Sequence, residues 1–422
     1  MFSNLRLGCF TLLVSGALAA CNQPPPTAFV TEVPWSLTGR WLVLDTHSHT
    51  TFSDGQQSVS DVVEQALLAG CDALAITDHS DPALHAASPD YFDAINAARK
   101  RFPSFVLFAG LEWNVPLVNP GEHAALLVVP SVEGTVLPEF KRRFDGTGET
   151  ARAALDWLGK RLSDESSGAL IVNHPSRGKA TVRDVQRDME TLRSTSRLFV
   201  GFEGAPGHQK ANPVGQYSKT LLAQDRWDQA VSQVGGVWDN MLDKGDSFWG
   251  ALAASDFHAE ADDHIPCAFS RTHIQVPERT HAGILRALRA GTFWSDHGRI
   301  LDRLTFVAMA PGLPLPAQPG ETIRLSPGQL LQLKVDTKRG QGAANSALNV
   351  EIIGNARSGR PEVMLRRTLG AKEDAVVFAL DNLSLGADKR TCYFRVRIRA
   401  PGRDGKDLLA YSNPIRVLLQ EK

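Results

Sequence analysis

The chain has 422 residues, more than one ordinary domain needs, so two domains are expected. Its 43% hydrophobic and 22% charged residues are an ordinary globular composition with enough apolar material for a large core. Basic residues (45) and acidic residues (46) nearly cancel and no long basic run occurs, which disfavours a nucleic-acid-binding or anionic-membrane-binding surface.

Residues 1–21 have the pattern of a targeting segment: Arg6, then an apolar run too short for a transmembrane helix, then Leu-Ala-Ala-Cys ending at Cys21. This ending resembles the bacterial lipobox, which implies lipidation of Cys21 and an exported lipoprotein. Such a protein is anchored to a membrane by this lipid only and faces the periplasm or cell exterior. An ordinary secretory signal is the alternative. The Pro-rich residues 22–36 are predicted to be an extended tether.

Three further cysteines, Cys71, Cys267 and Cys392, are odd in number, widely spaced and outside any Cys-x-x-Cys pattern. We expect buried, inert thiols, although the pattern leaves room for one disulfide.

After the tether, strand-like and helix-like runs alternate. Strands are predicted over residues 42–46, 73–77, 105–111, 124–129, 169–172, 198–203 and 251–255. Helices are predicted over residues 59–69, 90–101, 151–162, 219–234 and 281–290. This alternation predicts parallel α/β architecture over residues 37–302, and a barrel more than an open sheet. No Gly-x-Gly-x-x-Gly or Walker-type loop is present, which weakens a nucleotide-cofactor hypothesis.

The apolar pattern of the sequence changes near residue 300, where helical periodicity ends. Short β-like runs follow at residues 304–308, 331–335, 348–353, 376–380, 393–399 and 415–419. Residues 303–422 are therefore predicted to form an all-β sandwich-like domain with a packing or recognition role.

His47 and His49 stand at the end of the first predicted strand. Because residues i and i+2 of a strand face the same side, both imidazoles can point at one place. Asp54 follows on a turn closed by Gly55. Imidazoles with carboxylates suit zinc, manganese or iron.

Similar residues follow other predicted strands, where the active groups of β/α barrels lie. These are His79, Glu112, His174, Asp256 and His258, with His123 in the loop before the fourth strand. Each alone has a structural explanation: His174 before a proline can cap a turn, Asp78 can orient a loop, and Glu112 can pair with an arginine. Together, so many acids and imidazoles at one barrel mouth would be too costly without cations, which favours more than one metal ion.

The segments that carry these residues resemble the motif series of the PHP (polymerase and histidinol phosphatase) superfamily. They are residues 47–50, 53–55, 77–79, 110–112, 173–175 and 255–258, and the likeness spans residues 43–258. The resemblance implies a distorted (β/α)7 TIM-like barrel with two or three divalent ions (Zn, Mn or Fe) at its C-terminal face.

The resemblance also implies which residues hold each ion. The first would be held by His47, His49, Glu112 and Asp256; the second by Glu112, His123 and His174; the third by Asp54, His79 and His258. Many relatives have a histidine where Asp54 stands, and Glu122 is an alternative to His123. We assign catalytic roles to Asp256, Glu112 and His174.

Closely spaced divalent ions neutralise phosphate oxygens and activate water, so the leading hypothesis is a phosphoesterase for a small-molecule phosphomonoester or phosphodiester. Arg177, Lys179 and Arg299 are predicted to bind the substrate phosphate, with Arg271 as a further candidate. His264 and His297 are extra polar candidates near the mouth. No nucleic-acid partner is expected, and the oligomeric state stays open.

Two alternatives remain. One is a carbamate or ester hydrolase of the carbaryl-hydrolase-like branch, which poor phosphate-binding candidates and four nearby aromatic residues would favour: Trp113, Trp249, Phe257 and Trp294. The other is a non-catalytic binding lipoprotein that uses the barrel as a scaffold.

Overall fold

The computed structural model describes residues 32–116, 123–162, 164–205, 207–212, 215, 217, 221, 225–381, 383, 385 and 390–420. The predicted targeting segment, Cys21 and most of the predicted tether lie outside the described residues, as does Glu122, the alternative to His123. Among the described helices, none is long and apolar enough to cross a membrane.

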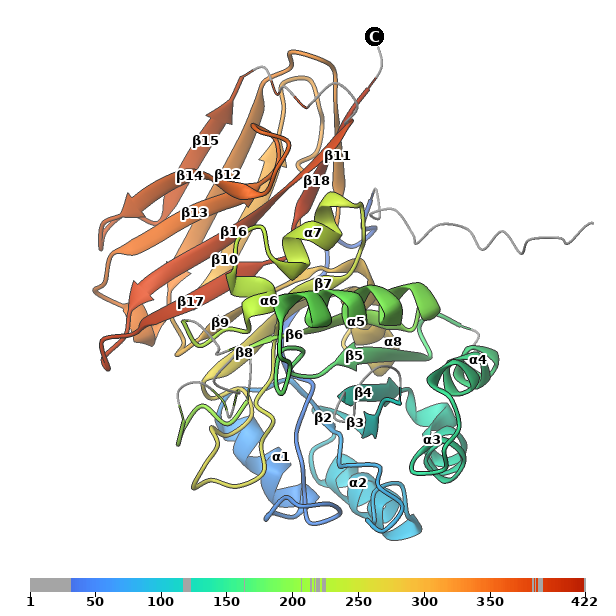
Figure 1. Ribbon diagram of the computed structural model, residues 1–422. Helices are drawn as coiled ribbons and strands as arrows, with labels where there is room; N and C mark the ends of the chain where they lie inside the picture. The colour runs from blue at the N-terminus through green and yellow to red at the C-terminus, as the bar shows by residue number, and fades with distance from the viewer. Residues whose placement is uncertain are drawn as a thin grey trace, which may run out of the picture.

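A strand lies at each of the seven places predicted before residue 256 (Figure 1). They are β1 (Arg40–Asp45), β2 (Ala73–Ile76), β3 (Val106–Asn114), β4 (His123–Val128), β5 (Gly168–Val172), β6 (Phe199–Ala205) and β7 (Trp249–Ala253). They follow one another in chain order across one sheet, and their residues are mostly buried, as in sheets covered on both faces. The mixed α/β fold is confirmed, while closure of a barrel stays a prediction.

The sheet is not wholly parallel, which corrects the predicted architecture. β4 runs antiparallel to both β3 and β5, whereas the β1–β2, β2–β3, β5–β6 and β6–β7 pairs are parallel. The physical reason is the connection between β3 and β4: only residues 115–122 separate them, too few for a crossover helix. His123, the first residue of β4, therefore pairs with Asn114, the last residue of β3, at the edge where the parallel strands end.

Four predicted helices match the structure within two residues: α1 (Val59–Leu68), α2 (Pro89–Arg101), α4 (Ala151–Arg161) and α8 (His281–Ala290). Each begins after a Ser or Thr whose side chain accepts a hydrogen bond from a backbone N–H of the first turn. α3 (Pro130–Phe144), α5 (Val182–Thr195) and α7 (Val237–Asp243) were not predicted.

The predicted helix over residues 219–234 is wrong in its described part. Only α6 (Gln229–Ser232) is helical there. Asp225 and Arg226 have φ of 53° and 63°, a left-handed conformation that interrupts a right-handed helix. The Asp228 side chain then accepts a hydrogen bond from the Ala230 N–H and starts the short helix afresh.

Two unpredicted strands, β8 (Ser270–Val276) and β9 (Phe293–His297), link the two halves of the chain. β8 pairs antiparallel with β1, and β9 pairs with both β8 and β17 (Asp407–Ser412). The sheet that carries β1–β7 thus continues into the C-terminal strands without a break.

The C-terminal region is strand-rich, as predicted (Figure 1). Besides β17 it contains β10 (Leu301–Met309), β11 (Thr322–Leu325), β12 (Leu331–Arg339), β13 (Leu348–Gly354), β14 (Glu362–Leu369), β15 (Ala375–Leu380), β16 (Thr391–Pro401) and β18 (Ile415–Leu419), with a short 3-10 helix, η1 (Gln341–Ala343). β10, β12 and β15 form a second sheet, and the region has a hydrophobic core of its own. The predicted division at residue 303 falls within β10 and stays a prediction.

Cys71 and Cys267 form a disulfide with their Cα atoms 5.5 Å apart, so the expectation of inert thiols is wrong for this pair. It is correct for Cys392, which is free and buried. The two bonded residues are 196 apart in sequence, and only the fold brings them together.

We expect the double variant Cys71→Ala/Cys267→Ala to lose about 2–4 kcal/mol of unfolding free energy, because the bond closes a long loop in the unfolded chain. The urea midpoint followed by circular dichroism measures this loss. Cys392→Ala is the control and should shift the midpoint less. Equal midpoints for the double variant and the unmodified chain would contradict a stabilising role.

Candidate metal centre

The segment that follows β1 brings two imidazoles to one place. His47 and His49 are fully buried, and their Nε2 atoms lie 3.0 Å apart. The Nδ1 of His47 lies 2.8 Å from Glu203 Oε1, which leaves its Nε2 facing the partner ring. This arrangement is typical of imidazoles held ready for a metal by an outer carboxylate.

Glu112, on β3, is the centre of the site. Its two carboxylate oxygens lie 2.9–3.4 Å from ring nitrogens of five histidines: His47, His49, His79, His123 and His174. The side-chain amide of Asn173 donates a further hydrogen bond of 2.8 Å to Oε1. A buried carboxylate with this many imidazole neighbours suits a ligand shared between two ions.

Asp256, in the loop after β7, shares the neighbours His47 and His49 with Glu112. Its Oδ1 is 3.3 Å from His47 Nε2 and 3.4 Å from His49 Nε2. Its Oδ2 accepts a 2.9 Å hydrogen bond from Arg177 and lies 3.1 Å from His208 Nε2. Asp256 has a φ of 49° and His174 a φ of 30°. Such strained backbone at non-glycine residues is characteristic of functional sites.

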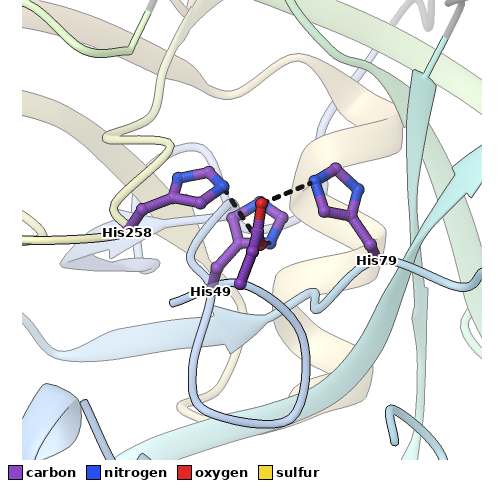
Figure 2. A group of neighbouring side chains, drawn as sticks. His49, His79 and His258 are labelled. Atoms are coloured by element: carbon purple, nitrogen blue, oxygen red, sulfur yellow. Dashed lines mark ion pairs between the residues drawn. The ribbon is translucent and has the colours of Figure 1, made fainter. Parts of the chain in front are cut away.

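A third group forms around Asp54, whose carboxylate lies 3.4–3.6 Å from ring nitrogens of His49, His79 and His258. Figure 2 shows these three histidines converging from separate parts of the chain. The Asp54 side chain is 53% exposed, so this group faces the solvent side of the site.

Asp78 secures the loop that carries Asp54. Its carboxylate accepts hydrogen bonds from the N–H of Thr50 (2.7 Å) and from the hydroxyls of Thr50 (2.7 Å) and Ser53 (2.6 Å). Gly55 closes the turn because a Cβ there would lie 2.5 Å from the backbone of His49. The predicted role of Asp78 outside the ligand set agrees with these contacts.

The electrostatics of the site couple the acids to the imidazoles. Burial opposes the charge on His79, but Asp54 and Glu112 outweigh it and raise its pKa to about 10. Burial likewise opposes charge on His208, and Asp256 and Asp263 raise its pKa to about 9. His174 differs: burial, aided by Arg177, lowers its pKa to about 3, so its ring is neutral.

We therefore expect divalent metal binding to release protons, because His79 holds a proton at neutral pH that a metal ligand must lose. Zinc can be titrated calorimetrically at pH 7 in several buffers. The observed binding enthalpy should depend linearly on the ionisation enthalpy of the buffer. The slope should correspond to about one or more protons released per chain. His79→Gln should lower that number. A buffer-independent enthalpy would contradict the prediction.

The described residues contain four groups whose ligand atoms lie within 4.8 Å of one another. They are His49–Asp54–His79–His258, His47–His49–Glu112, His79–Glu112–His123 and His208–Asp256–His258. These nitrogen and oxygen donors fit zinc, manganese or iron. All nine predicted ligands come together at this site, including His123 and Asp54.

Glu203 and His208 contact predicted ligands and were not themselves predicted as site residues. Glu203 accepts a hydrogen bond from the His174 N–H (3.0 Å) in addition to its contact with His47. It ends a predicted strand, so the strand-end rule already offered the signal. His208 lies between Asp256 and Asp263, 2.7 Å from the latter. It stands beyond β6 with no motif around it, and only the fold reveals it.

Of the predicted substrate-binding residues, the structure brings Arg177 to the site and places two elsewhere. Lys179 is buried beside Asp188 on α5, 3.0 Å away. Arg299 donates hydrogen bonds to the backbone carbonyls of Ala69 and Ala268. These partners hold both cations away from the centre.

The other polar candidates also lie apart from the centre. Arg271 forms a two-bond ion pair with Asp296 (2.8 and 2.9 Å). The rings of His264 and His297 each stack on the ring of Phe269, with centroid distances of 4.3 and 5.0 Å. Neither histidine lines the cavity described next.

A cavity of about 410 Å³ opens over the site. Its described lining is Asp54, Gln56, His79, Glu112, His123, His174, Arg177, His208, Asp256, His258, Ala259, Asp262 and Asp263. The aromatic residues expected for a carbamate hydrolase are absent from this lining. Instead, Trp113, Trp249, Phe257 and Trp294 are buried in the hydrophobic cores.

Residues 45–229 match the model of the PHP domain. No curated protein gives a significant match. A two-domain protein from Bacteroides vulgatus containing a predicted PHP-like metal-dependent phosphoesterase is 15% identical, over 93% of this chain and 99% of that one, with a TM-score of 0.44. An amidohydrolase from Chromobacterium violaceum with bound sulfate and no metal is 16% identical, over 58% of this chain and 96% of that one, with a TM-score of 0.33. The PHP match contains all the predicted ligands except Asp256 and His258.

Proposed function

We propose that this chain, whose residues 45–229 carry a PHP domain, is a metal-dependent phosphoesterase for a small-molecule phosphomonoester or phosphodiester. The observation that carries the proposal is a polar cavity in which one arginine faces the clustered acids and imidazoles. Two or three bound divalent ions would supply Lewis-acid charge and lower the pKa of water.

Arg177 supports the phosphate assignment. Its Nη1 donates to Asp256 at 2.9 Å, and the guanidinium lies 5.7 Å from the centre of the Tyr217 ring. Its Nε and Nη2 are buried and have no hydrogen-bond partner among the described residues. Unpaired buried N–H groups are costly, and two of them on one planar guanidinium match the oxygens of a phosphate.

The residues behind the ligands set their orientation. Glu203 accepts a hydrogen bond from His47 Nδ1, and Asn173 donates one to Glu112, so the facing atoms of both ligands are fixed. Asp256 in turn holds Arg177 against the site. Substrate phosphate would therefore meet pre-positioned groups, which is what phosphoryl-transfer chemistry requires of a protein.

Arg177→Met is expected to raise KM for a phosphate ester by about 10–100-fold, with a smaller effect on kcat, because it removes a charge-assisted contact to the substrate. Steady-state kinetics on the metal-loaded protein measure this. Arg183→Met is the matched control, since Arg183 is exposed on α5. An unchanged KM for Arg177→Met would remove this residue from the substrate site.

Reconstitution with manganese or zinc tests the proposed activity directly. Turnover of a chromogenic phosphomonoester, a phosphodiester and an aryl ester or carbamate is compared, with His49→Ala and Asp256→Ala as inactive controls. Metal-dependent phosphate release that both variants lose is the expected result. Cleavage of carbonyl esters alone would support the carbamate-hydrolase alternative. No turnover and no bound metal would support the binding-protein alternative.

The proposal includes export as a lipoprotein acylated at Cys21. The Cys71–Cys267 disulfide supports export, because disulfides persist mainly in oxidising compartments.

A further inference from the structure

Four exposed apolar side chains gather near the start of the described chain: Leu37 (62% exposed), Trp41 (47%), Leu313 (37%) and Leu315 (60%). We call them the Leu37 patch. In the described part of the chain, the other exposed large hydrophobic residues are Leu68 and Val377. Grouped apolar exposure of this kind marks an interaction surface, whereas single exposed residues are ordinary.

The Leu37 patch is continuous because it lines two adjoining hollows of about 520 and 290 Å³. Leu37, Ser36 and Pro316 line both. Leu313 and Leu315 line the first hollow together with residues 32–34, and Trp41 lines the second. The patch therefore joins the first described residues to the loop between β10 and β11.

The patch is separate from the candidate metal centre. Trp41 is the second residue of β1, whereas His47 lies just beyond the other end of this strand. At about 3.3 Å per residue, roughly 20 Å separates the two positions. Leu37 and Trp41 thus lie near the beginning of β1, and the polar cavity lies over its end.

We infer that the Leu37 patch seats the protein on the surface of a lipid bilayer. The predicted acylated Cys21 precedes Glu32, a residue of the first hollow, by 11 positions. A chain of that length spans at most about 40 Å, so the patch stays close to the membrane that holds the anchor. Tryptophan favours the membrane interface, and an apolar contact adds to the binding that an acyl anchor provides.

Seating through this patch has a consequence for the site. Because the patch and the cavity lie toward opposite ends of β1, the cavity is directed away from the bilayer. Substrate would reach it from the aqueous side. The inference rests on the predicted lipid at Cys21 and is independent of which bond the centre cleaves.

The test uses the full chain, purified from bacterial membranes in detergent and reconstituted into phosphatidylcholine vesicles with brominated acyl chains. We expect bromine to quench tryptophan emission, and Trp41→Phe to lose most of this quenching. Trp41 is the exposed tryptophan of the described residues, and the others are buried or half-buried.

A matched pair of variants separates the patch from general surface apolarity. Leu37→Ser/Leu313→Ser/Leu315→Ser should weaken the quenching, and Leu68→Ser/Val377→Ser should leave it unchanged. Vesicle-bound chain without quenching, or equal quenching in Trp41→Phe, would overturn the inference. Recovery of the chain only in the soluble fraction would also overturn it. So would a dimer in sedimentation that the triple variant dissociates, because the patch would then contact a second copy.

Discussion

Glu112→Gln is expected to lower kcat/KM by about 10³-fold or more and to remove bound metal from the centre. Glu112 lies within 3.4 Å of ring nitrogens on five histidines, and no other described carboxylate has so many imidazole neighbours at that distance. Glutamine keeps the shape of the side chain but loses its negative charge and one acceptor. The predicted ions would then keep the imidazole ligands but lose the carboxylate that they are expected to share.

Metal content by mass spectrometry and steady-state kinetics on the same samples measure both effects. Glu133→Gln is the matched control: this glutamate is also buried, but it pairs with Arg99 away from the site. It should keep full metal content. Full metal content and full activity in Glu112→Gln would exclude Glu112 from the ligand set.

The second large effect is expected in stability, at the contact between the helical and strand-rich regions. Asp239 on α7 and Arg395 on β16 are both fully buried and form two hydrogen bonds of 2.7 and 2.8 Å. Tyr393 donates a third hydrogen bond of 3.0 Å to Asp239, and the Arg395 guanidinium lies 4.8 Å from the centre of the Trp238 ring.

Asp239→Asn should therefore lower the free energy of unfolding by about 3–5 kcal/mol, because it leaves the Arg395 charge buried and uncompensated. Urea midpoints measure the loss. Asp336→Asn is the control, since Asp336 pairs with the 60% exposed Arg303 and such pairs contribute about 0–1 kcal/mol.

A double variant distinguishes the lost charge balance from lost packing. Asp239→Leu/Arg395→Met removes both charges, so it should be less destabilised than Asp239→Asn alone. If the double variant were instead the less stable of the two, the ion pair itself would be a net source of stability.

The strands around the candidate site could be predicted from the sequence, and so could the polar residues that gather there. Short continuous apolar runs locate β1–β7, because strands buried on both faces need apolar residues at successive positions. The polar residues after those runs, from His47 to His258, are the ones that converge. Local pattern suffices here because the ends of parallel strands meet at one edge of a sheet, so position along each strand predicts position in the site.

Other features depended on tertiary structure. The antiparallel direction of β4, which brings in His123, follows from the short connection to β3 once these two strands pair, and the apolar pattern of β4 alone does not show that pairing. The Cys71–Cys267 bond and the His208–Asp256 contact join residues far apart in the chain, with no local signal.

The predicted substrate-binding residues show most clearly which features the sequence predicts and which depend on the tertiary structure. Arg177, Lys179 and Arg299 all follow predicted ligands or strands, and nothing local separates them. Long, flexible cationic side chains pair with a carboxylate or backbone carbonyl that the fold places near them. For Arg177 that partner is Asp256 in the site, whereas Lys179 meets Asp188 and Arg299 meets backbone carbonyls outside it. Strand ends could be predicted from the sequence because their geometry is local. The partners of these cations could not be predicted, because the packing of distant elements decides them.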